Sequence, residues 1–352
     1  MGTRGGQDRG VVGAWFAELE PPPDVFAVVM ATGIVSIAAG DHRYFGIGIA
    51  LAVLAVLAFV VLGLGFLLRV ARQPARALAP TRDPDVALRM FTFVAACTVL
   101  GVRLRAYPVV EWLLAALALA GWLVLMPLAV FDVGSRPRAD LRAHAHGAWL
   151  LPSVATAGLA ATAANLSAGL ATPWLLVTGA AVWILGVLLY LAVTALIAWR
   201  ALAAPFVPRE VTPDSWILMG ALAITALAGD RVLAAERVLG WPTSLQEVSV
   251  VLTYGAWVLA GLWIPVLLYA EVWRTDQVPG SLRYQGVWWS AVFPLGMYST
   301  ASYATATELH MHSLITISLV IFWIAFTVWI LVALGLLHSA VARRTSTGRV
   351  SS

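Results

Sequence analysis

Ten apolar runs, each long enough to cross a lipid bilayer, constrain this chain more than any other feature of its sequence. They lie at about residues 24–40, 45–69, 86–105, 109–130, 148–165, 173–199, 214–230, 247–273, 286–305 and 313–341. A bilayer core of about 30 Å needs roughly 20 apolar residues in an α-helix. With 61% hydrophobic and 11% charged residues, the chain holds more apolar surface than a soluble core could bury. The sequence therefore predicts an all-α integral membrane protein with ten transmembrane helices.

The predicted transmembrane domain covers residues 21–342, with a short segment 1–20 before it and a tail 343–352 after it. Segment 1–20 has no long apolar core, so we expect no cleavable signal peptide. All 22 basic residues are arginine. Sixteen lie in connections on one side of the predicted spans, five lie on the other side, and Arg89 lies within a span. The positive-inside bias therefore predicts a multi-pass protein of the plasma (inner) membrane with both termini in the cytoplasm.

The spans that start near residues 24, 86, 148, 214 and 286 recur at similar intervals, which indicates a helical hairpin repeated five times. The odd-numbered spans hold 14 Ser or Thr residues in 92 positions, whereas the even-numbered spans hold 9 in 130. Helices that face lipid are apolar all round, so this difference favours an inner pore ring of odd helices inside an outer ring of even helices. The alternative is ordinary bundle packing, in which small and hydroxyl-bearing residues let helices approach one another.

The ninth span contains a proline and a glycine at membrane depth. Pro294 removes the backbone hydrogen bond to the carbonyl of Ser290, which costs about 3 kcal/mol in a helix interior. Freed backbone at that depth is tolerated only where protein or a water-filled cavity satisfies it. We therefore predict that this span borders a pathway, that Pro294 and Gly296 kink it, and that Phe293 beside the kink is the gate.

Small and hydroxyl-bearing residues share faces of the odd-numbered spans, because they follow one another at three- and four-residue steps. The predicted pore-lining positions are Thr32, Gly33, Ser36, Thr92, Ser153, Thr156, Thr225 and Thr300. A pore of this kind is narrow and weakly polar, and small anions can pass it by exchanging water for hydroxyl donors and helix dipoles. The alternative for each hydroxyl is a hydrogen bond to a carbonyl of its own helix.

Arg89 and Arg103 lie near the two ends of the third span and share one helical face with the small residues between them. We predict that they form two anion-attracting mouths. An arginine within a span costs roughly 2.5 to 3.5 kcal/mol at the bilayer centre and less near an end. The alternative is that both side chains extend to the lipid headgroups.

Other ionisable residues stand near the span ends. Asp230 and Arg231 are predicted to form a local ion pair, and His144 and His146 are expected to be solvated in a basic loop. A proton-coupled carrier usually needs an ionisable relay within its spans, and the odd spans show none apart from their ends. The sequence therefore favours a passive route, or coupling carried by a protonated substrate.

A short motif after the ninth span supports a different class of function. Glu308, His310 and His312 have the residue types of metal ligands, so the alternative function is a metal-dependent polytopic membrane enzyme that uses this cluster. The chain contains no lysine and hence no Walker lysine for a phosphate-binding loop, which argues against ATP-driven transport by this chain alone.

Two motifs resemble a known family. Pro23-Asp24-Val25-Phe26 leads into Val28-Val29-Met30-Ala31-Thr32-Gly33-Ile34-Val35-Ser36, and Trp288-Trp289 precedes Phe293-Pro294-Leu295-Gly296. In these residues the chain resembles the tellurite-resistance and C4-dicarboxylate transporter family, which includes slow anion channels and fungal malate and sulfite transporters. The resemblance implies five helical hairpins around a central anion pathway, commonly in a trimer of independent pores. It also implies a phenylalanine that closes the pore from the ninth helix, at the place that Phe293 occupies.

The sequence thus predicts transmembrane transport of small anions through a central pore gated by a phenylalanine. C4-dicarboxylates, sulfite, halides, nitrate and tellurite-type anions all remain open as substrates, and so does the choice between channel and coupled carrier. We expect no enzymatic activity, no cofactor and no resident metal. The expected partners are the anion, the lipid bilayer and two further copies of the chain in a homotrimer, without nucleic acid.

Overall fold

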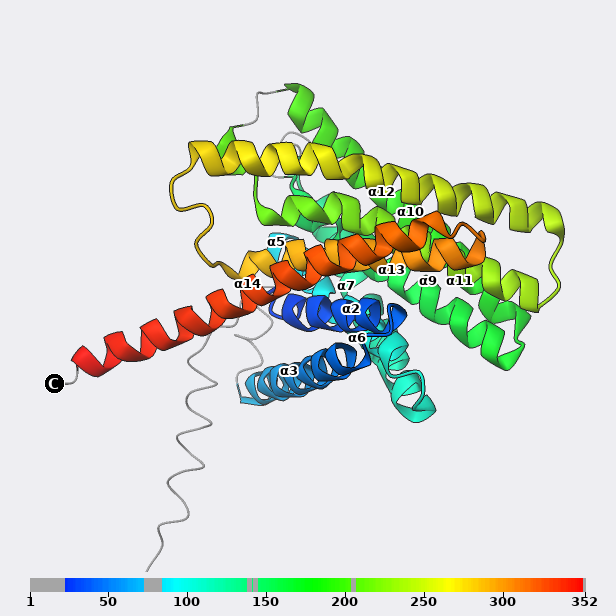
Figure 1. The fold of residues 1–352 in the computed structure, drawn as a ribbon, viewed down its shortest axis with the longest axis horizontal. Coiled ribbons are helices and arrows are strands. Elements are labelled where there is room, and N and C mark those ends of the chain that lie inside the picture. Colours follow the sequence, from blue (N-terminus) through cyan, green and yellow to red (C-terminus); the bar gives the residue numbers. More distant parts are fainter. Residues whose placement is uncertain (1–22, 73–83, 138–140, 142–144, 204–206, 351–352) are drawn as a thin grey trace, which may run out of the picture.

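The computed structural model describes residues 23–72, 84–137, 141, 145–203 and 207–350, with side chains described up to residue 342 (Figure 1). The predicted segment 1–20 lies outside the described residues. Every regular element in the described part of the chain is helical, and the last helix continues to Val350. The prediction of an all-α protein is confirmed.

The helices fall into two sets that alternate along the chain. The first set consists of α2 (Ala27–Asp41), α5 (Pro84–Arg89) with α6 (Phe91–Arg103), α9 (Leu151–Leu170), α11 (Ile217–Val238) and α13 (Trp289–Glu308). The short helices η2 (Gly147–Leu150), η4 (Pro213–Trp216) and η5 (Gly286–Trp288) lead into the last three of these, and η3 (Pro208–Glu210) precedes η4. The second set consists of α3 (Phe45–Arg72), α7 (Pro108–Gly134), α10 (Pro173–Ala203), α12 (Thr243–Gln277) and α14 (Ser313–Val350).

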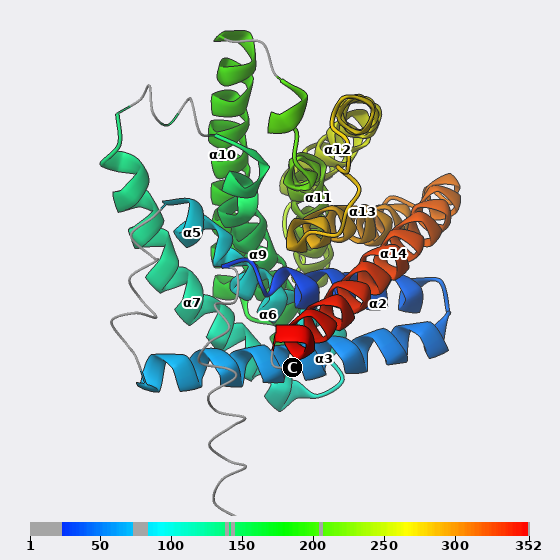
Figure 2. The same ribbon diagram turned by 90° about the vertical axis from the view of Figure 1, so that its left-hand side faces the viewer.

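Burial separates the two sets, which we call the inner and the outer helices. In the most apolar stretches of α9 and α11, 89% of the residues are buried, against 17–28% in the five outer helices. The inner helices also contact one another in sequence, α2 with α6, α6 with α9, α9 with α11 and α11 with α13, and α13 contacts α2 again (Figure 2). The outer helices therefore present most of their apolar surface to the surroundings.

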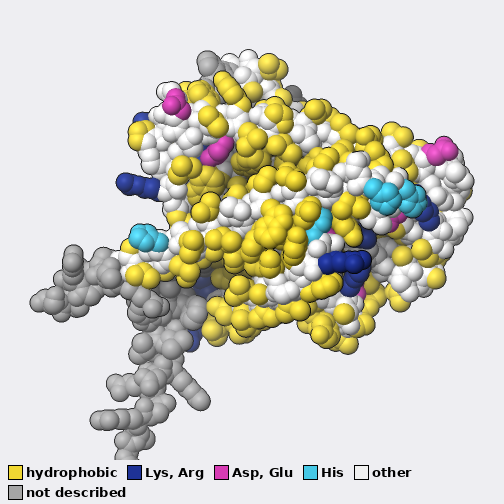
Figure 3. All heavy atoms as spheres, viewed as in Figure 1, with side chains coloured by type: hydrophobic (Ala, Val, Ile, Leu, Met, Phe, Trp, Pro, Cys, Tyr) yellow, Lys and Arg dark blue, Asp and Glu magenta, His cyan; other side chains and the backbone are white. Residues whose placement is uncertain are grey.

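Eight helices of the described chain are long and apolar enough to cross a membrane, and the protein is thus a multi-pass membrane protein. The face seen in Figure 3 agrees, because hydrophobic side chains cover its middle and charged side chains gather toward its two ends. The other two predicted spans correspond to α2, which has only 15 residues, and α13, which is less apolar. The count of ten spans and the arrangement as a pore ring stay predictions.

Two glycines allow α13 to approach both of its inner neighbours closely. A Cβ atom on Gly220 of α11 would lie 2.8 Å from Cγ of Pro294, and one on Gly296 of α13 would lie 2.8 Å from Cγ2 of Ile34 in α2. Real Cβ atoms do not approach other atoms this closely, so an added methyl group would force the helices apart. Pro294 and Gly296 consequently serve helix packing, whatever else they do.

Tryptophans of the outer helices donate their indole N–H to the inner helix of the next hairpin. The four pairs are Trp122 to Thr156 Oγ1 at 2.9 Å, Trp183 to the carbonyl of Thr225 at 2.9 Å, Trp257 to Ser302 Oγ at 2.9 Å, and Trp329 to Thr32 Oγ1 at 3.0 Å. The last pair joins α14 to α2. The final hairpin is thereby bonded to the first in the same way as the second, third and fourth hairpins are each bonded to the next, whereas α3 of the first hairpin contains no tryptophan.

We expect Gly220→Ala to lower the free energy of unfolding by about 1–3 kcal/mol, because the new methyl group overpacks the contact with Pro294. The matched control is Gly255→Ala in α12, where nothing lies within 4 Å of the added carbon, and which we expect to be neutral or slightly stabilising. Detergent-induced unfolding followed by tryptophan fluorescence measures both. Equal effects of the two substitutions would contradict the close approach.

Candidate functional site

The residues predicted to form the gate lie in the interior of the protein. Phe293 is completely buried, with 0% of its surface exposed, so its ring does not face lipid. Its neighbours along the helix contact both adjacent inner helices, Pro294 against Gly220 and Gly296 against Ile34. Helix α13 continues without interruption through Pro294. The role of Phe293 as a gate stays a prediction.

Four of the predicted lining positions contact neighbouring helices rather than an open space. Thr32 and Thr156 accept the indole hydrogen bonds of outer-helix tryptophans. Ser36 and Ser153 donate to outer-helix carbonyls, Ser36 to that of Gly48 at 2.7 Å and Ser153 to that of Gly186 at 2.9 Å. These four hydroxyls connect the inner helices to the outer ones. Their role in lining a pore stays a prediction.

The other lining candidates behave differently from one another. Thr225 donates to a carbonyl of its own helix, as the alternative for each hydroxyl predicted, and Thr92 donates to the carbonyl of Arg89 at the end of the preceding α5. Gly33 faces Val99 of α6, where a Cβ atom would lie 2.8 Å from Cγ1. Thr300 is 3% exposed, and its hydroxyl has no hydrogen-bond partner among the described residues. The Thr300 hydroxyl instead lies beside the carboxyl of Asp41 at the end of α2.

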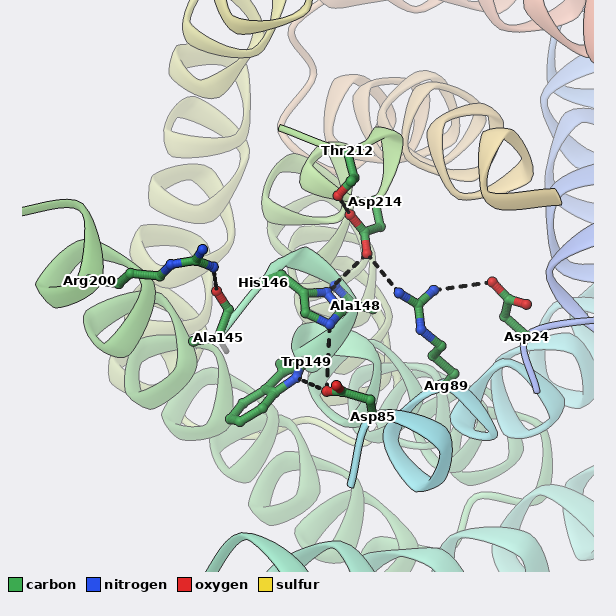
Figure 4. A network of polar contacts seen from close by, with 10 residues as sticks. All are labelled: Asp24, Asp85, Arg89, Ala145, His146, Ala148, Trp149, Arg200, Thr212 and Asp214. Carbon is green, nitrogen blue, oxygen red and sulfur yellow. Dashed lines mark hydrogen bonds and ion pairs between the residues drawn. The ribbon is translucent and has the colours of Figure 1, made fainter. Parts of the chain in front are cut away.

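Arg89 is held between two carboxylates at the end where the inner helices begin (Figure 4). Its Nη1 lies 3.2 Å from Oδ2 of Asp24, ahead of α2, and its Nη2 lies 3.3 Å from Oδ2 of Asp214 in η4. Asp214 is almost fully buried, with 1% of its side chain exposed, and Thr212 also donates to it. The positive charge of Arg89 is thus compensated by the protein itself.

His146 extends this network to a further inner helix. Its Nδ1 lies 3.0 Å from Oδ2 of Asp214 and its Nε2 lies 3.6 Å from Oδ1 of Asp85, which also accepts the indole N–H of Trp149 (Figure 4). We call Asp24, Asp85, Arg89, His146 and Asp214 the charged network. It connects the starts of α2, α5, α9 and α11. The expectation that His146 is solvated was wrong, and His144 lies outside the described residues.

Burial by itself would lower the pKa of His146, but its hydrogen bonds to the Asp214 and Asp85 carboxylates raise the pKa to about 9. The imidazolium form is therefore present at neutral pH, where it separates two carboxylates that would otherwise repel one another.

Sequence reasoning missed this network. A signal was present, however, because Pro23-Asp24, Pro84-Asp85 and Pro213-Asp214 repeat the same dipeptide ahead of three inner helices.

Arg103 lies at the opposite end of its span and has a different environment. Its Nε donates to Oγ of Ser36 at 2.7 Å, and no ion pair to it is found in the part of the chain that the structure describes. Asp230 also lies toward this opposite end. Its Oδ2 accepts a hydrogen bond from Thr305 at 2.8 Å. Arg231 interacts electrostatically with the same carboxyl, but no direct ion pair between the two side chains is found among the described residues.

The cluster on which the enzyme alternative depended is not assembled. In the described chain no group of three histidine, cysteine or acidic side chains is placed to hold a metal ion. Glu308 instead forms an ion pair with Arg237, whose Nη1 lies 2.8 Å from its Oε2. The residue types of Glu308, His310 and His312 were compatible with a metal site, but their positions are not.

Fold and site together define a multi-pass helical membrane protein whose inner helices carry most of its buried serine and threonine hydroxyls. Residues 21–337 match the family model described as voltage-dependent anion channel, and this chain belongs to that family. The resemblance drawn from the two sequence motifs is thereby confirmed. Membership implies transport of anions across a membrane and points to a transporter rather than an enzyme.

Relatives with curated names are similar to this chain over different lengths. An uncharacterized membrane protein of Mycobacterium tuberculosis is 36% identical over 169 residues, which are 46% of this chain and 82% of the relative. Two uncharacterized transporters of Methanocaldococcus jannaschii are 22% and 20% identical, and each alignment covers 87% of this chain and 90% of the relative. The similarity to the two transporters thus extends over nearly all of the membrane-embedded part.

We expect the stability of the protein to depend on the protonation of His146. A group whose folded-state pKa is raised contributes stability that is present below its ordinary value of 6.5 and is lost as the pH rises through about 9. Thermal unfolding in detergent should therefore show a falling midpoint across this interval. His146→Gln keeps one donor but cannot titrate, and its midpoint should fall less. The same slope in both proteins would contradict the assignment.

Proposed function

We propose that the chain is a channel or carrier in which α2, α6, α9, α11 and α13 surround a central route for small anions, with ten spans in all. The closed sequence of contacts among these helices supports the proposal. So does the composition of α13, because a helix with this many hydroxyls is stable at membrane depth only where protein covers it. Of its 20 residues, 17 are buried.

The proposal assigns the gate to Phe293. The observation that carries this assignment is the complete burial of a large aromatic ring on an inner helix, directly beside the two contacts that fix that helix against α2 and α11. A phenyl ring offers no hydrogen bond to an anion that must leave its water shell, so it closes the route both sterically and energetically. Movement of the ring would open it.

We expect Phe293→Ala to raise anion flux several-fold in reconstituted vesicles, because it removes the obstructing ring and leaves the backbone of α13 unchanged. The measurement is the rate of anion exit under a clamped membrane potential. Phe322→Ala is a matched control, since Phe322 is also fully buried but belongs to the outer helix α14. Unchanged flux in Phe293→Ala, or an equal rise in both variants, would remove the gate assignment.

Arg89 and Arg103 attract anions unequally in this proposal. The two carboxylates beside Arg89 cancel its field at a distance, whereas the partner of Arg103 in the described part of the chain is a neutral hydroxyl. Charges that line a narrow passage set its selectivity according to the uncompensated charge. The mouth at Arg103 therefore contributes more to the preference for anions than the mouth at Arg89.

Arg103→Gln is accordingly expected to lower the permeability ratio of anion over cation more than Arg89→Gln does. Reversal potentials across planar bilayers with a salt gradient measure this ratio. Arg89→Gln also leaves Asp214 buried without its cation, so a thermal melt of each variant should accompany the measurement. A larger loss of selectivity in Arg89→Gln, in a protein that remains folded, would contradict the proposed asymmetry.

The remaining parts of the proposal concern assembly and substrate. The distribution of arginines supports a protein of the plasma membrane with both termini in the cytoplasm. The family resemblance supports assembly as a homotrimer. C4-dicarboxylates, sulfite, halides, nitrate and tellurite-type anions are the candidate substrates. Vesicle flux with malate, sulfite, chloride, nitrate and tellurite in turn identifies which of them the protein carries.

A further inference from the structure

Among the buried polar atoms near one end of the inner helices that lack a hydrogen-bond partner in the described chain, three belong to neighbouring inner helices. They are Oδ2 of Asp41 at the end of α2, Oδ1 of Asp230 in α11 and Oγ1 of Thr300 in α13. Unpaired polar atoms are uncommon in protein interiors, and each one indicates a functional role or a small species that it binds. Thr300 and Asp230 are 3% and 1% exposed, so bulk water does not compensate either group.

These groups form one cluster, at the end of the protein opposite the charged network. Asp24, in the charged network, precedes the start of α2, whereas Asp41 is the last residue of that helix. The Thr300 hydroxyl lies beside the Asp41 carboxyl, and Arg231 interacts electrostatically with the carboxyls of both Asp41 and Asp230. Helices α2, α13 and α11 are successive neighbours, so the cluster joins three of the five inner helices.

Asp230 is the member of this cluster with the least compensation. Its Oδ2 accepts one hydrogen bond, from Thr305. The charged groups that face it are Glu308, a like charge, and the guanidinium groups of Arg231 and Arg237. Arg237 is already paired with Glu308, and Arg231 is shared with Asp41. An ionised carboxylate buried without a partner of its own is costly, and uptake of a proton removes that cost.

We propose that Asp230 binds a proton that travels together with the transported anion. This inference rests on the proposed anion route and specifies its driving force. The carboxylate takes a proton from the solution on one side, becomes a neutral carboxylic acid, and returns the proton to the solution on the other side. No other reactant is needed, and the anion itself is chemically unchanged.

The coupling follows from the placement of the charges. While Asp230 is ionised, its negative charge opposes the entry of an anion into the proposed route, and protonation removes this repulsion. The Thr300 hydroxyl, which lies beside Asp41, can then turn to donate to the anion, and Arg231 is no longer divided between two carboxylates. Because linkage is reciprocal, a bound anion favours protonation of Asp230 as much as protonation favours binding of the anion.

The test measures proton and anion movement in the same vesicles. Protein is reconstituted with a pH-sensitive dye inside, the membrane potential is clamped with potassium and an ionophore, and inward gradients of chloride, nitrate, malate and sulfite are applied one at a time. Wild-type protein should acidify the lumen in proportion to the anion that enters. Asp230→Asn, which is neutral in all conditions, should retain anion flux but lose roughly tenfold or more of the proton movement per anion.

Glu236→Gln is the matched control. Glu236 lies on the same helix, is 3% exposed, accepts one hydroxyl hydrogen bond and has one unpartnered oxygen, but its partner is Ser249 of the outer helix α12. We expect Glu236→Gln to keep the wild-type ratio of protons to anions. Asp230→Glu, which restores a titratable carboxyl, should recover part of the coupling, and size-exclusion profiles show that each variant is folded.

Each result has a distinct meaning. Proton movement per anion that is unchanged in Asp230→Asn overturns the inference, and it assigns the proton to the substrate itself when the anion is malate or sulfite. Loss of coupling in Glu236→Gln but not in Asp230→Asn overturns it as well. Anion flux without proton movement in the wild type refutes this inference and leaves the proposed anion route intact. No flux of any tested anion refutes the anion route, and the inference fails with it.

Discussion

Lipid offers no hydrogen bonds, and this constraint determines how the two sets of helices are joined. Polar groups at membrane depth have to find their partners inside the protein. Here the inner helices carry most of the buried serine and threonine hydroxyls, and the outer helices supply indole N–H groups and backbone carbonyls to several of them. The outer helices can then be apolar elsewhere. A polar interior is thus enclosed by a lipid-compatible surface without long polar side chains.

The same constraint explains why α13 can exist. With its serines, threonines, glycine and proline it is not apolar enough to cross lipid by itself, yet neighbours cover nearly all of it. Ser299 and Ser318 exchange hydrogen bonds with each other's carbonyls at 2.8 and 2.7 Å, which ties α13 to α14. Gly220 and Gly296 admit α13 between α11 and α2. The helix that carries Phe293 is therefore the one most dependent on its surroundings.

Sequence reasoning predicted the features that depend on helical periodicity and composition. The alternation of hydroxyl-rich and apolar spans indicated which helices are buried, and the proline of the ninth span indicated that Phe293 is in the interior. It could not predict which face of each helix meets which neighbour. Thr32 and Thr156 were interpreted as lining, whereas their hydroxyls accept bonds from Trp329 and Trp122, residues distant in the sequence.

Charged residues were harder still, because their partners come from separate hairpins. Arg89 was predicted as an anion-attracting mouth, but Asp24 and Asp214, which lie 65 and 125 positions away, occupy its guanidinium. A single span contains no information about such distant partners. The repeated Pro-Asp dipeptide was the only local trace of this arrangement, and it becomes meaningful once the inner helices are known to begin at one end.

The two ends of the inner helices differ in how far their charges are compensated. At the charged network, carboxylates lie near the starts of parallel helices, where the helix dipoles favour negative charge. Arg89 and His146 form ion pairs with these carboxylates. At the opposite end, Asp41 is the last residue of α2, where the helix dipole disfavours negative charge. Asp41 and Asp230 each have one oxygen without a hydrogen-bond partner among the described residues. A site that changes its charge during transport has to be incompletely compensated, since a fully paired carboxylate has no reason to take up a proton. The charges at one end of the inner helices are thus compensated more fully than those at the other, and the proposed proton coupling depends on this asymmetry.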